Sequence, residues 1–258
     1  MRGPFTSLPL LLTSSVVAHD PGVALSDTQT RKSLTIKSIY EWLRVDPSLA
    51  IVICDGSNYD FTPEITLLFP QAKIECLHFE NAQSEVEKYG RGFGEGEIIR
   101  FALERSKFIH AAQCFAKCTA KLWVENFEDC KKQWNGYWVC KGVFDNALSL
   151  NKSPVFSYID TRFYFVSVDF YKTHLLNAHL SISKDSGFGL EQSFKRVFLN
   201  QKMRLAMFRC YPCIEGVGGG TGKSYKNSFF RKMKEAIKGL RIRNVDTLRS
   251  MFTSPSEF

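Results

Sequence analysis

The stretch that decides the fold reads KYGRGFGEGEIIRFALE (88–104) and, after a short gap, FAKCTAKLWVEN (115–126). Its first part places four glycines and two acids at the start of an amphipathic helix. The apolar positions of that helix recur at helical spacing: Ile98, Ile99, Ala102 and Leu103. Its second part is typical of a buried strand, 115–124, since apolar residues dominate it.

The segments on either side alternate between strand-like and helix-like patterns. We predict strands at 7–13, 50–54 and 73–79, a capped helix from 26 to about 43, a strand or hairpin at 155–169, and helices at 190–201 and 227–240. This alternation favours one α/β domain with a Rossmann-like, mostly parallel sheet and helices on both faces. Ligands of such sheets lie at the carboxyl ends of the strands, here 13–15, 55–58 and 117–126.

Lys117 and Lys121 interrupt the strand at 115–124 and flank Thr119. Lysines are rarely buried without an anionic partner, so this strand end is predicted to face an anion such as a phosphate. Gly92 and Gly94 would let the backbone approach the same ligand. Glu95 either binds sugar hydroxyls or only favours the helix N-terminus through the helix dipole.

A second glycine-rich segment, EGVGGGTGKS (215–224), resembles a P-loop but has Val217 where that motif needs glycine. Its backbone N–H groups, with Gly222 and Lys223, could instead surround an anion as a mobile lid. An ordinary turn before a helix is the other interpretation.

Two carboxylates are candidates for a general base. Asp160 lies in an otherwise apolar strand, where an unpaired charge is costly, and Arg162 on the same face offers a structural ion pair as the alternative. Glu191 begins a predicted helix, where an acid also fits the helix dipole. Either would need an acceptor hydroxyl within hydrogen-bond reach.

The net charge of +8 is concentrated near the end of the chain. Residues 223–249 carry nine Lys or Arg and two acids, which suits nucleic acid, an anionic membrane surface or a phosphorylated substrate. The predicted helix at 227–240 would bury one apolar side and leave a basic side to solvent. The side chains expected to be buried are Phe229, Phe230, Met233, Ile237 and Leu240.

The eight cysteines are scattered, and the one CxxC pair, Cys210 and Cys213, lacks the further ligands of a zinc site. Most are expected to be buried thiols in a reducing cytosol. No apolar run reaches the length of a membrane span. The N-terminus, 1–18, is better explained by a first core strand than by a weak signal peptide.

Taken together, six segments resemble a group of bacterial glycosyltransferases that build capsular polysaccharide and lipopolysaccharide. They are LLLTSSV (10–16), IVICDGSNYDF (51–61), 88–104, 115–126, YIDTRFYFVSVDFYKTHL (158–175) and IEGVGGGTGKSYK (214–226). The resemblance implies a GT-A-like fold, with a nucleotide-sugar-binding half at about 1–130 and an acceptor-binding half at about 131–258. The donor it suggests is a UDP-sugar, or else a CMP- or GDP-sugar, and the acceptor is an oligosaccharide or lipid-linked glycan.

Carried onto this chain, the resemblance places the nucleotide near the ends of the first two strands and the diphosphate near the strand at 115–124. The segment 215–223 would be the closing loop. Relatives commonly read Thr-Gly-Arg where this chain has Thr119-Ala120-Lys121, and no Asp-x-Asp is present, which leaves metal dependence open. The donor site so predicted comprises Thr13, Ser14, Ser15, Arg31, Asp55, Ser57, Asn58, Gly92, Gly94, Glu95, Lys117, Thr119, Lys121, Arg162, Gly222 and Lys223.

The leading interpretation is therefore a cytoplasmic glycosyltransferase, with peripheral contact to the inner membrane through its basic end. A basic α/β protein associated with nucleic acid is the alternative, although no nucleic-acid-binding motif is present, and a P-loop kinase is a weaker one.

Overall fold

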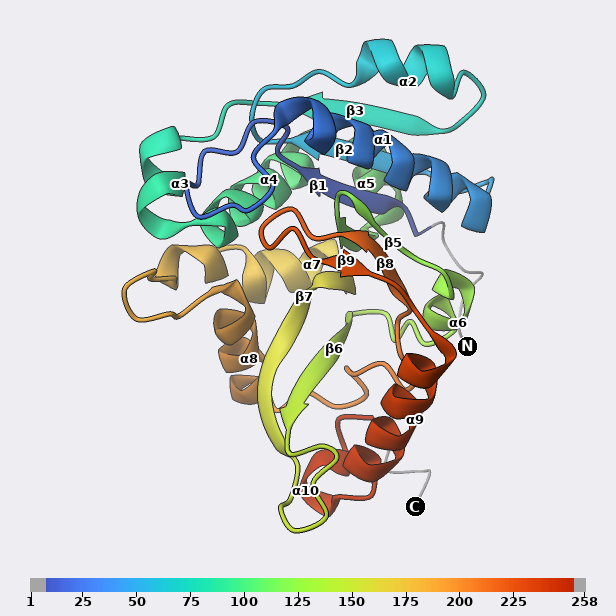
Figure 1. Cartoon of the computed structure of the whole chain (residues 1–258), viewed down its shortest axis with the longest axis vertical. Helices are drawn as coiled ribbons and strands as arrows, with labels where there is room; N and C mark the ends of the chain where they lie inside the picture. Colours follow the sequence, from blue (N-terminus) through green and yellow to red (C-terminus); the bar gives the residue numbers. More distant parts are fainter. Residues whose placement is uncertain (1–7, 253–258) are drawn as a thin grey trace.

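The computed structural model describes residues 8–252, with the side chains of 246 and 247 excepted. Its centre is a six-stranded sheet in the order β3-β2-β1-β4-β7-β6, and a smaller sheet has the order β5-β8-β9 (Figure 1). The strands are β1 (Leu10–Ser14), β2 (Ile51–Asp55), β3 (Ile74–His78), β4 (Cys114–Thr119), β5 (Leu122–Val124), β6 (Trp138–Asp145), β7 (Val155–Ser167), β8 (Ile214–Val217) and β9 (Ser224–Tyr225).

The longer helices are α1 (Thr28–Val45), α4 (Arg91–Arg105), α8 (Leu190–Asn200) and α9 (Phe229–Arg243). Shorter ones are α2 (Thr62–Leu68), α3 (Gln83–Tyr89), α5 (Lys107–Ala112), α6 (Phe127–Lys131), α7 (Val168–Phe170) and α10 (Asp246–Arg249), with a π-helix η1 (Tyr171–Leu175) and a 3₁₀-helix η2 (Ala178–Ser181).

The predicted α/β fold is confirmed: β3, β2, β1 and β4 are mutually parallel, while β7 runs antiparallel to β4. Alternate side chains of the buried strands point to opposite faces of the sheet. Leu11 and Val52 belong to the core shared with α4, α5 and α8, whereas Leu12 and Ile53 belong to the core shared with α1 and α6. The sheet is thus covered on both faces. Ser7, the predicted start of the first strand, lies outside the described residues.

The predicted strand at 115–124 is two strands in two sheets. β4 ends at Thr119, and the chain turns through Ala120 and Lys121 before β5 joins the small sheet. Lys121 has a φ of 75°, a left-handed conformation that is uncommon for a residue other than glycine. The turn therefore carries Lys121 away from the sheet and into the space beyond the end of β4.

The region 134–143, which looks irregular in the sequence, contains most of β6. Its pairing with β7 shifts register between Cys140 and Lys141, and such a bulge breaks the alternation by which a strand is recognised.

The glycines at 92, 94 and 96 lie inside the first turns of α4 rather than in a loop before it. A Cβ at Gly96 would lie 2.2 Å from Cγ of His179, and one at Gly94 would lie 3.3 Å from a methyl group of Val86. Gly96 is thus required for helix packing against η2. Gly92 and Gly94 therefore lie in a helix and not in a loop, although both line the cavity described below.

The predicted burial of the apolar side of α9 is wrong. Its large apolar side chains are exposed, while the side that faces the protein carries Arg231 and the buried Ile242. α9 lies at the outside of the molecule, beyond the small sheet (Figure 1). Within residues 8–252, no helix is both long and apolar enough to cross a membrane.

Candidate active site

A cavity of about 930 Å³ opens at the carboxyl ends of β1 and β4. Its walls come from the loop after β1, the first turns of α4, the β4–β5 turn, the first half of β7, the start of α8 and the β8–β9 loop. Many of the predicted site residues line it: Thr13, Ser14, Ser15, Arg31, Gly92, Gly94, Glu95, Thr119, Lys121, Asp160, Arg162, Glu191 and Lys223. The predicted residues that do not line it are Asp55, Ser57, Asn58, Lys117 and Gly222.

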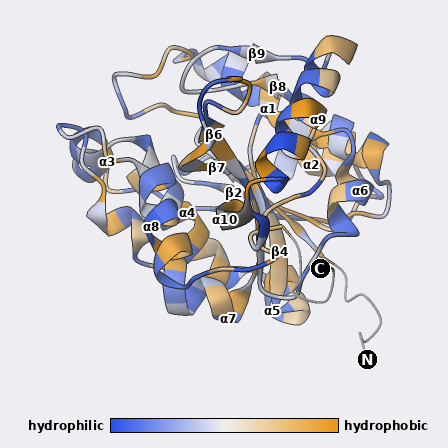
Figure 2. Ribbon diagram, turned by 90° about the horizontal axis from the view of Figure 1, so that it is seen from below, coloured by the Kyte–Doolittle hydropathy of each residue, from blue (hydrophilic) through white to orange (hydrophobic). Residues whose placement is uncertain are grey.

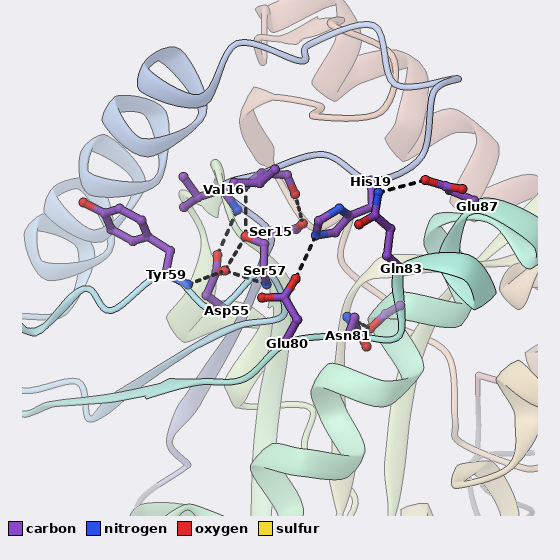
Figure 3. A network of polar contacts seen from close by, with 12 residues as sticks. Ser15, Val16, His19, Asp55, Ser57, Tyr59, Glu80, Asn81, Gln83 and Glu87 are labelled. Carbon is purple, nitrogen blue, oxygen red and sulfur yellow. Dashed lines mark hydrogen bonds and ion pairs between the residues drawn. The ribbon is translucent and has the colours of Figure 1, made fainter.

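Asp55 and Ser57 lie behind the wall that the loop after β1 forms (Figure 3). The Asp55 carboxylate accepts hydrogen bonds from the backbone N–H of Val16 at 2.9 Å and from the N–H and hydroxyl of Ser57 at 2.8 and 2.6 Å. Ser57 Oγ accepts the N–H of Val17 at 2.9 Å. The two residues therefore fix the cavity wall from the end of β2, while Asn58 contacts the exposed His78 instead.

Lys117 already has its anionic partner within the protein. Its fully buried Nζ lies 2.7 Å from Oε1 of Glu95 and donates hydrogen bonds to Thr119 Oγ1 and to the carbonyl of Thr161. A buried charge that is paired and hydrogen-bonded in this way holds β4, α4 and β7 together. The predicted role of Lys117 as a phosphate ligand is therefore corrected, and Glu95 is occupied by the same ion pair.

Lys121 is the cation that this arrangement leaves available. Its side chain is 3% exposed, and within residues 8–252 no carboxylate lies within ion-pair distance of its Nζ. Burial and the nearby positive charge of Arg31 together lower the pKa of Lys121 to about 7, although the negative charge of Asp55 opposes them. A buried ammonium without an anion is unfavourable, so an anion that enters the cavity would be bound here.

The β8–β9 loop closes over Lys121. A Cβ at Gly219 would lie 2.8 Å from Cε of Lys121 and 3.3 Å from Nη1 of Arg31, and one at Gly220 would lie 2.6 Å from Nη1 of Arg91. The glycines thus let the loop backbone approach three cationic side chains. Arg31 also donates to the carbonyls of Ser15 and Leu25, so it braces the loop after β1.

This loop is not a P-loop. It joins β8 to the antiparallel β9, whereas a P-loop connects a strand directly to a helix. Gly222, with a φ of 66°, closes the turn by donating its N–H to the carbonyl of Gly218 at 2.7 Å. The P-loop kinase interpretation is therefore wrong.

Asp160 is held by Arg162. The guanidinium donates from Nε to one carboxylate oxygen at 2.8 Å and from Nη2 to the other at 2.5 Å, and Lys141 Nζ lies 3.8 Å away. Burial alone would raise the pKa of Asp160, but the hydrogen bonds and charge of Arg162 outweigh it, and the pKa lies below its usual range. A carboxylate with both oxygens bound to a guanidinium is a poor proton acceptor, so the ion pair accounts for this residue.

Glu191 has the opposite environment. It is the second residue of α8 and lines the cavity, and the hydroxyl of Thr161 lies 3.5 Å from its Oε1. Burial raises the pKa of Glu191, and the nearby negative charges of Glu95 and Asp160 raise it further against its own backbone N–H and Arg91. Of these two carboxylates in the cavity, whose pKa values are shifted in opposite directions, Glu191 is the better proton acceptor on chemical grounds.

Sequence reasoning missed two features of the cavity. Arg91, the first residue of α4, lies against the β8–β9 loop, although it stands within the stretch first quoted. Lys184 forms an ion pair with Asp20 at 3.0 Å and also donates to the carbonyl of Glu87. That pair joins the loop after β1 to the loop before α8, and no pattern in the sequence connects residues so far apart.

The end of β4 presents a cationic side chain to the cavity. In the part of the chain that the structure describes, no group of three or more His, Cys, Asp or Glu side chains is arranged to hold a metal ion. The side chain that enters the cavity after β4 is the ammonium of Lys121, which repels a cation.

The comparisons with known proteins agree with this architecture. No protein-family model and no curated protein matches the chain. Among solved structures, the inositol-1-phosphate CTP transferase from T. maritima is similar over 90% of this chain and 97% of its own, with 8% identity and a TM-score of 0.50. Mouse xyloside xylosyltransferase 1 covers 78% of this chain and 84% of its own, with 10% identity and a TM-score of 0.45.

Core-mannan synthase A from Aspergillus fumigatus covers 86% of this chain and 82% of its own, with 11% identity and a TM-score of 0.42. At such identities the likeness concerns the fold alone. The chain has a mostly parallel α/β fold like that of the T. maritima CTP transferase.

Proposed function

We propose that the protein is a glycosyltransferase that moves a sugar from a nucleotide diphosphate to a hydroxyl group of a saccharide or lipid-linked acceptor. One observation carries the proposal: the same cavity contains Lys121, a buried cation with no ion-pair partner among the described side chains, and the carboxylate Glu191. The first suits a diphosphate leaving group, and the second suits an acceptor hydroxyl that must lose its proton.

The chemistry of Glu191 favours glycosyl transfer over nucleotidyl transfer, the other reaction found on this fold. A nucleotidyltransferase whose acceptor is a phosphate attacks with an oxygen that is already anionic, and it needs no base. A sugar hydroxyl is a weak nucleophile until a base takes its proton. A carboxylate with a raised pKa and no cation bound to it meets that need.

In the proposed reaction the acceptor oxygen attacks the anomeric carbon while Glu191 takes the hydroxyl proton. The bond from that carbon to the diphosphate breaks, and the ammonium of Lys121 and the N–H groups of the β8–β9 loop stabilise the charge that develops on the leaving group. This single displacement inverts the anomeric centre. Arg162, held by Asp160 and stacked at 4.7 Å on the ring of Tyr225, positions that loop on the acceptor side.

The finer assignments rest on the sequence resemblance. The donor is a UDP-sugar, with CMP- and GDP-sugars as alternatives, and residues 1–130 supply most of its site. Residues 131–258 supply Glu191 and bind the acceptor, a precursor of a bacterial capsule or lipopolysaccharide. The cavity includes residues from both halves, as this division requires.

A thermal-shift panel of UDP, GDP, CMP, dTDP and ATP, each with Mn²⁺ or with EDTA, tests the donor site. A ligand at a hundredfold excess over its Kd stabilises the folded state by about 2.7 kcal/mol. We expect one sugar-donor nucleotide to raise Tm equally with the metal and with EDTA. The matching nucleotide sugar, incubated with protein, should release its nucleoside diphosphate, or CMP where the donor is a CMP-sugar. Release of pyrophosphate from CTP instead would identify a nucleotidyltransferase.

A further inference from the structure

The outer side of α9 is an exposed apolar stripe. Its members are Phe229 (76% exposed), Phe230 (75%), Met233 (46%), Ile237 (50%) and Leu240 (58%). At about 100° per residue, these five positions fall within roughly 100° of arc on one side of the helix. Figure 2 shows hydrophobic and hydrophilic residues alternating along the α9 ribbon, as an amphipathic helix requires. Here, however, the apolar side is turned to solvent.

The opposite side of the helix holds it to the protein. Ile242 is buried, Arg231 lies 6.0 Å from the ring centroids of Tyr211 and Tyr225, and Lys232 pairs with Glu125 at 3.4 Å. These contacts fix the rotation of α9 and keep its apolar stripe outward. An exposed apolar patch that is built in this way indicates an interaction surface.

Basic residues border the stripe on both sides. Helical spacing places Lys234 and Arg241 along one edge and Lys232 and Arg243 along the other. A second copy of the chain would bring an equally basic helix against this one, which like charges oppose. Nucleic acid would meet the cations but has no counterpart for Met233, Ile237 and Leu240. An anionic bilayer satisfies both parts of the surface, because its headgroups attract the cations and its acyl boundary accepts the apolar side chains.

We propose that α9 docks the protein on an anionic lipid bilayer, with the helix lying in the interface and the stripe inserted. α9 is then an in-plane anchor rather than a span. The cavity lies next to the N-terminal part of α9. Arg231, near the start of α9, lines the cavity from the protein-facing side of the helix, so docking holds this part of the cavity about one helix diameter from the membrane surface. For the glycosyltransferase proposed above, on which this step rests, a cavity near the membrane favours a lipid-linked acceptor over a soluble one.

Vesicle co-sedimentation tests the docking without any donor or acceptor. The full chain should bind phosphatidylcholine vesicles that contain about 30% phosphatidylglycerol at least tenfold more tightly than phosphatidylcholine alone. Replacing the apolar pair, Phe229→Ser with Phe230→Ser, should weaken this binding at least tenfold. Replacing the charged pair, Lys234→Gln with Arg241→Gln, should weaken it about 25-fold, about fivefold for each charge.

Matched controls remove the same chemistry elsewhere. Leu67→Ser with Leu68→Ser removes two exposed leucines (79% and 52%) on α2, at the far end of the molecule (Figure 1). Lys107→Gln with Lys172→Gln removes two exposed cations. Both controls should bind within twofold of the unchanged protein. Equal loss in the controls, or a dimer in solution that Phe229→Ser with Phe230→Ser dissociates, would overturn the proposal. The nucleotide-induced Tm shift, measured on each variant, separates failure of docking from failure of the proposed activity.

Discussion

The pKa of Lys121 leads to a sharp prediction about nucleotide binding. With a pKa of about 7 in the free protein, the side chain is half protonated at pH 7 and almost wholly neutral at pH 9. A bound diphosphate favours the ammonium, so binding takes up a proton. Above pH 7 the phosphates are already fully ionised, since their last pKa is about 6. Between pH 7 and 9, Kd should therefore rise about 50-fold, or about 2 kcal/mol.

Two substitutions separate charge from shape at this position. Lys121→Arg keeps a cation that stays protonated over this range, so its Kd should be flat from pH 7 to 9. Lys121→Met keeps the bulk without the charge and should bind weakly at every pH. Isothermal titration with the nucleotide that the thermal-shift panel selects measures all three proteins. A change of less than about threefold for the unchanged protein, or the same slope for Lys121→Met, would refute the reasoning.

Three further predictions concern the other walls of the cavity. Glu191→Gln should lower kcat by about 10²–10⁴-fold and leave nucleotide binding unchanged. It should also remove the acid limb of the pH–rate profile, whose midpoint lies above the ordinary pKa of glutamate because the pKa of Glu191 is raised; steady-state kinetics measure both effects. Gly219→Val should abolish nucleotide binding, because its Cβ would meet Lys121 and Arg31, with Thr221→Val as the matched loop control in the same titration. Asp160→Asn should cost about 3–5 kcal/mol in urea unfolding, because it leaves Arg162 and Lys141 buried without their anion, and its Kd for the nucleotide should be unaffected once folded.

The parallel part of the sheet was predictable because each of its strands has a recognisable local pattern of apolar residues. Residues 51–54 form a continuous apolar run, and 114–118 is apolar except for Lys117, as is typical of strands buried on both faces. The helices at α1 and α8 follow from helical spacing with a cap at one end. Since ligands of parallel sheets bind at the carboxyl ends of the strands, the position of the cavity followed from the same runs.

The roles within the cavity were not predictable, because they depend on which charges meet. Lys117 and Lys121 are equivalent in the sequence: each is a lysine in an apolar run beside Thr119. Only the fold shows that Glu95 reaches Lys117 and that the left-handed turn removes Lys121 from the strand. The same holds for α9. Helical spacing identifies an apolar side but does not reveal whether anything covers it.

The buried side chain of Lys121 is also a source of instability, and this links folding to binding. A lysine whose pKa falls from 10.5 to about 7 on folding costs the native state about 5 kcal/mol at low pH. Its pKa is depressed in the folded state, so the unfolded chain binds more protons between pH 7 and 10.5, and this group makes stability rise with pH across that window. The negative charge of a bound diphosphate opposes this depression and raises the pKa of Lys121 again. Nucleotide binding therefore recovers part of the free energy by which the buried Lys121 destabilises the native state. The stabilisation by ligand should accordingly be larger at pH 7 than at pH 9, and Lys121→Met should lose that difference.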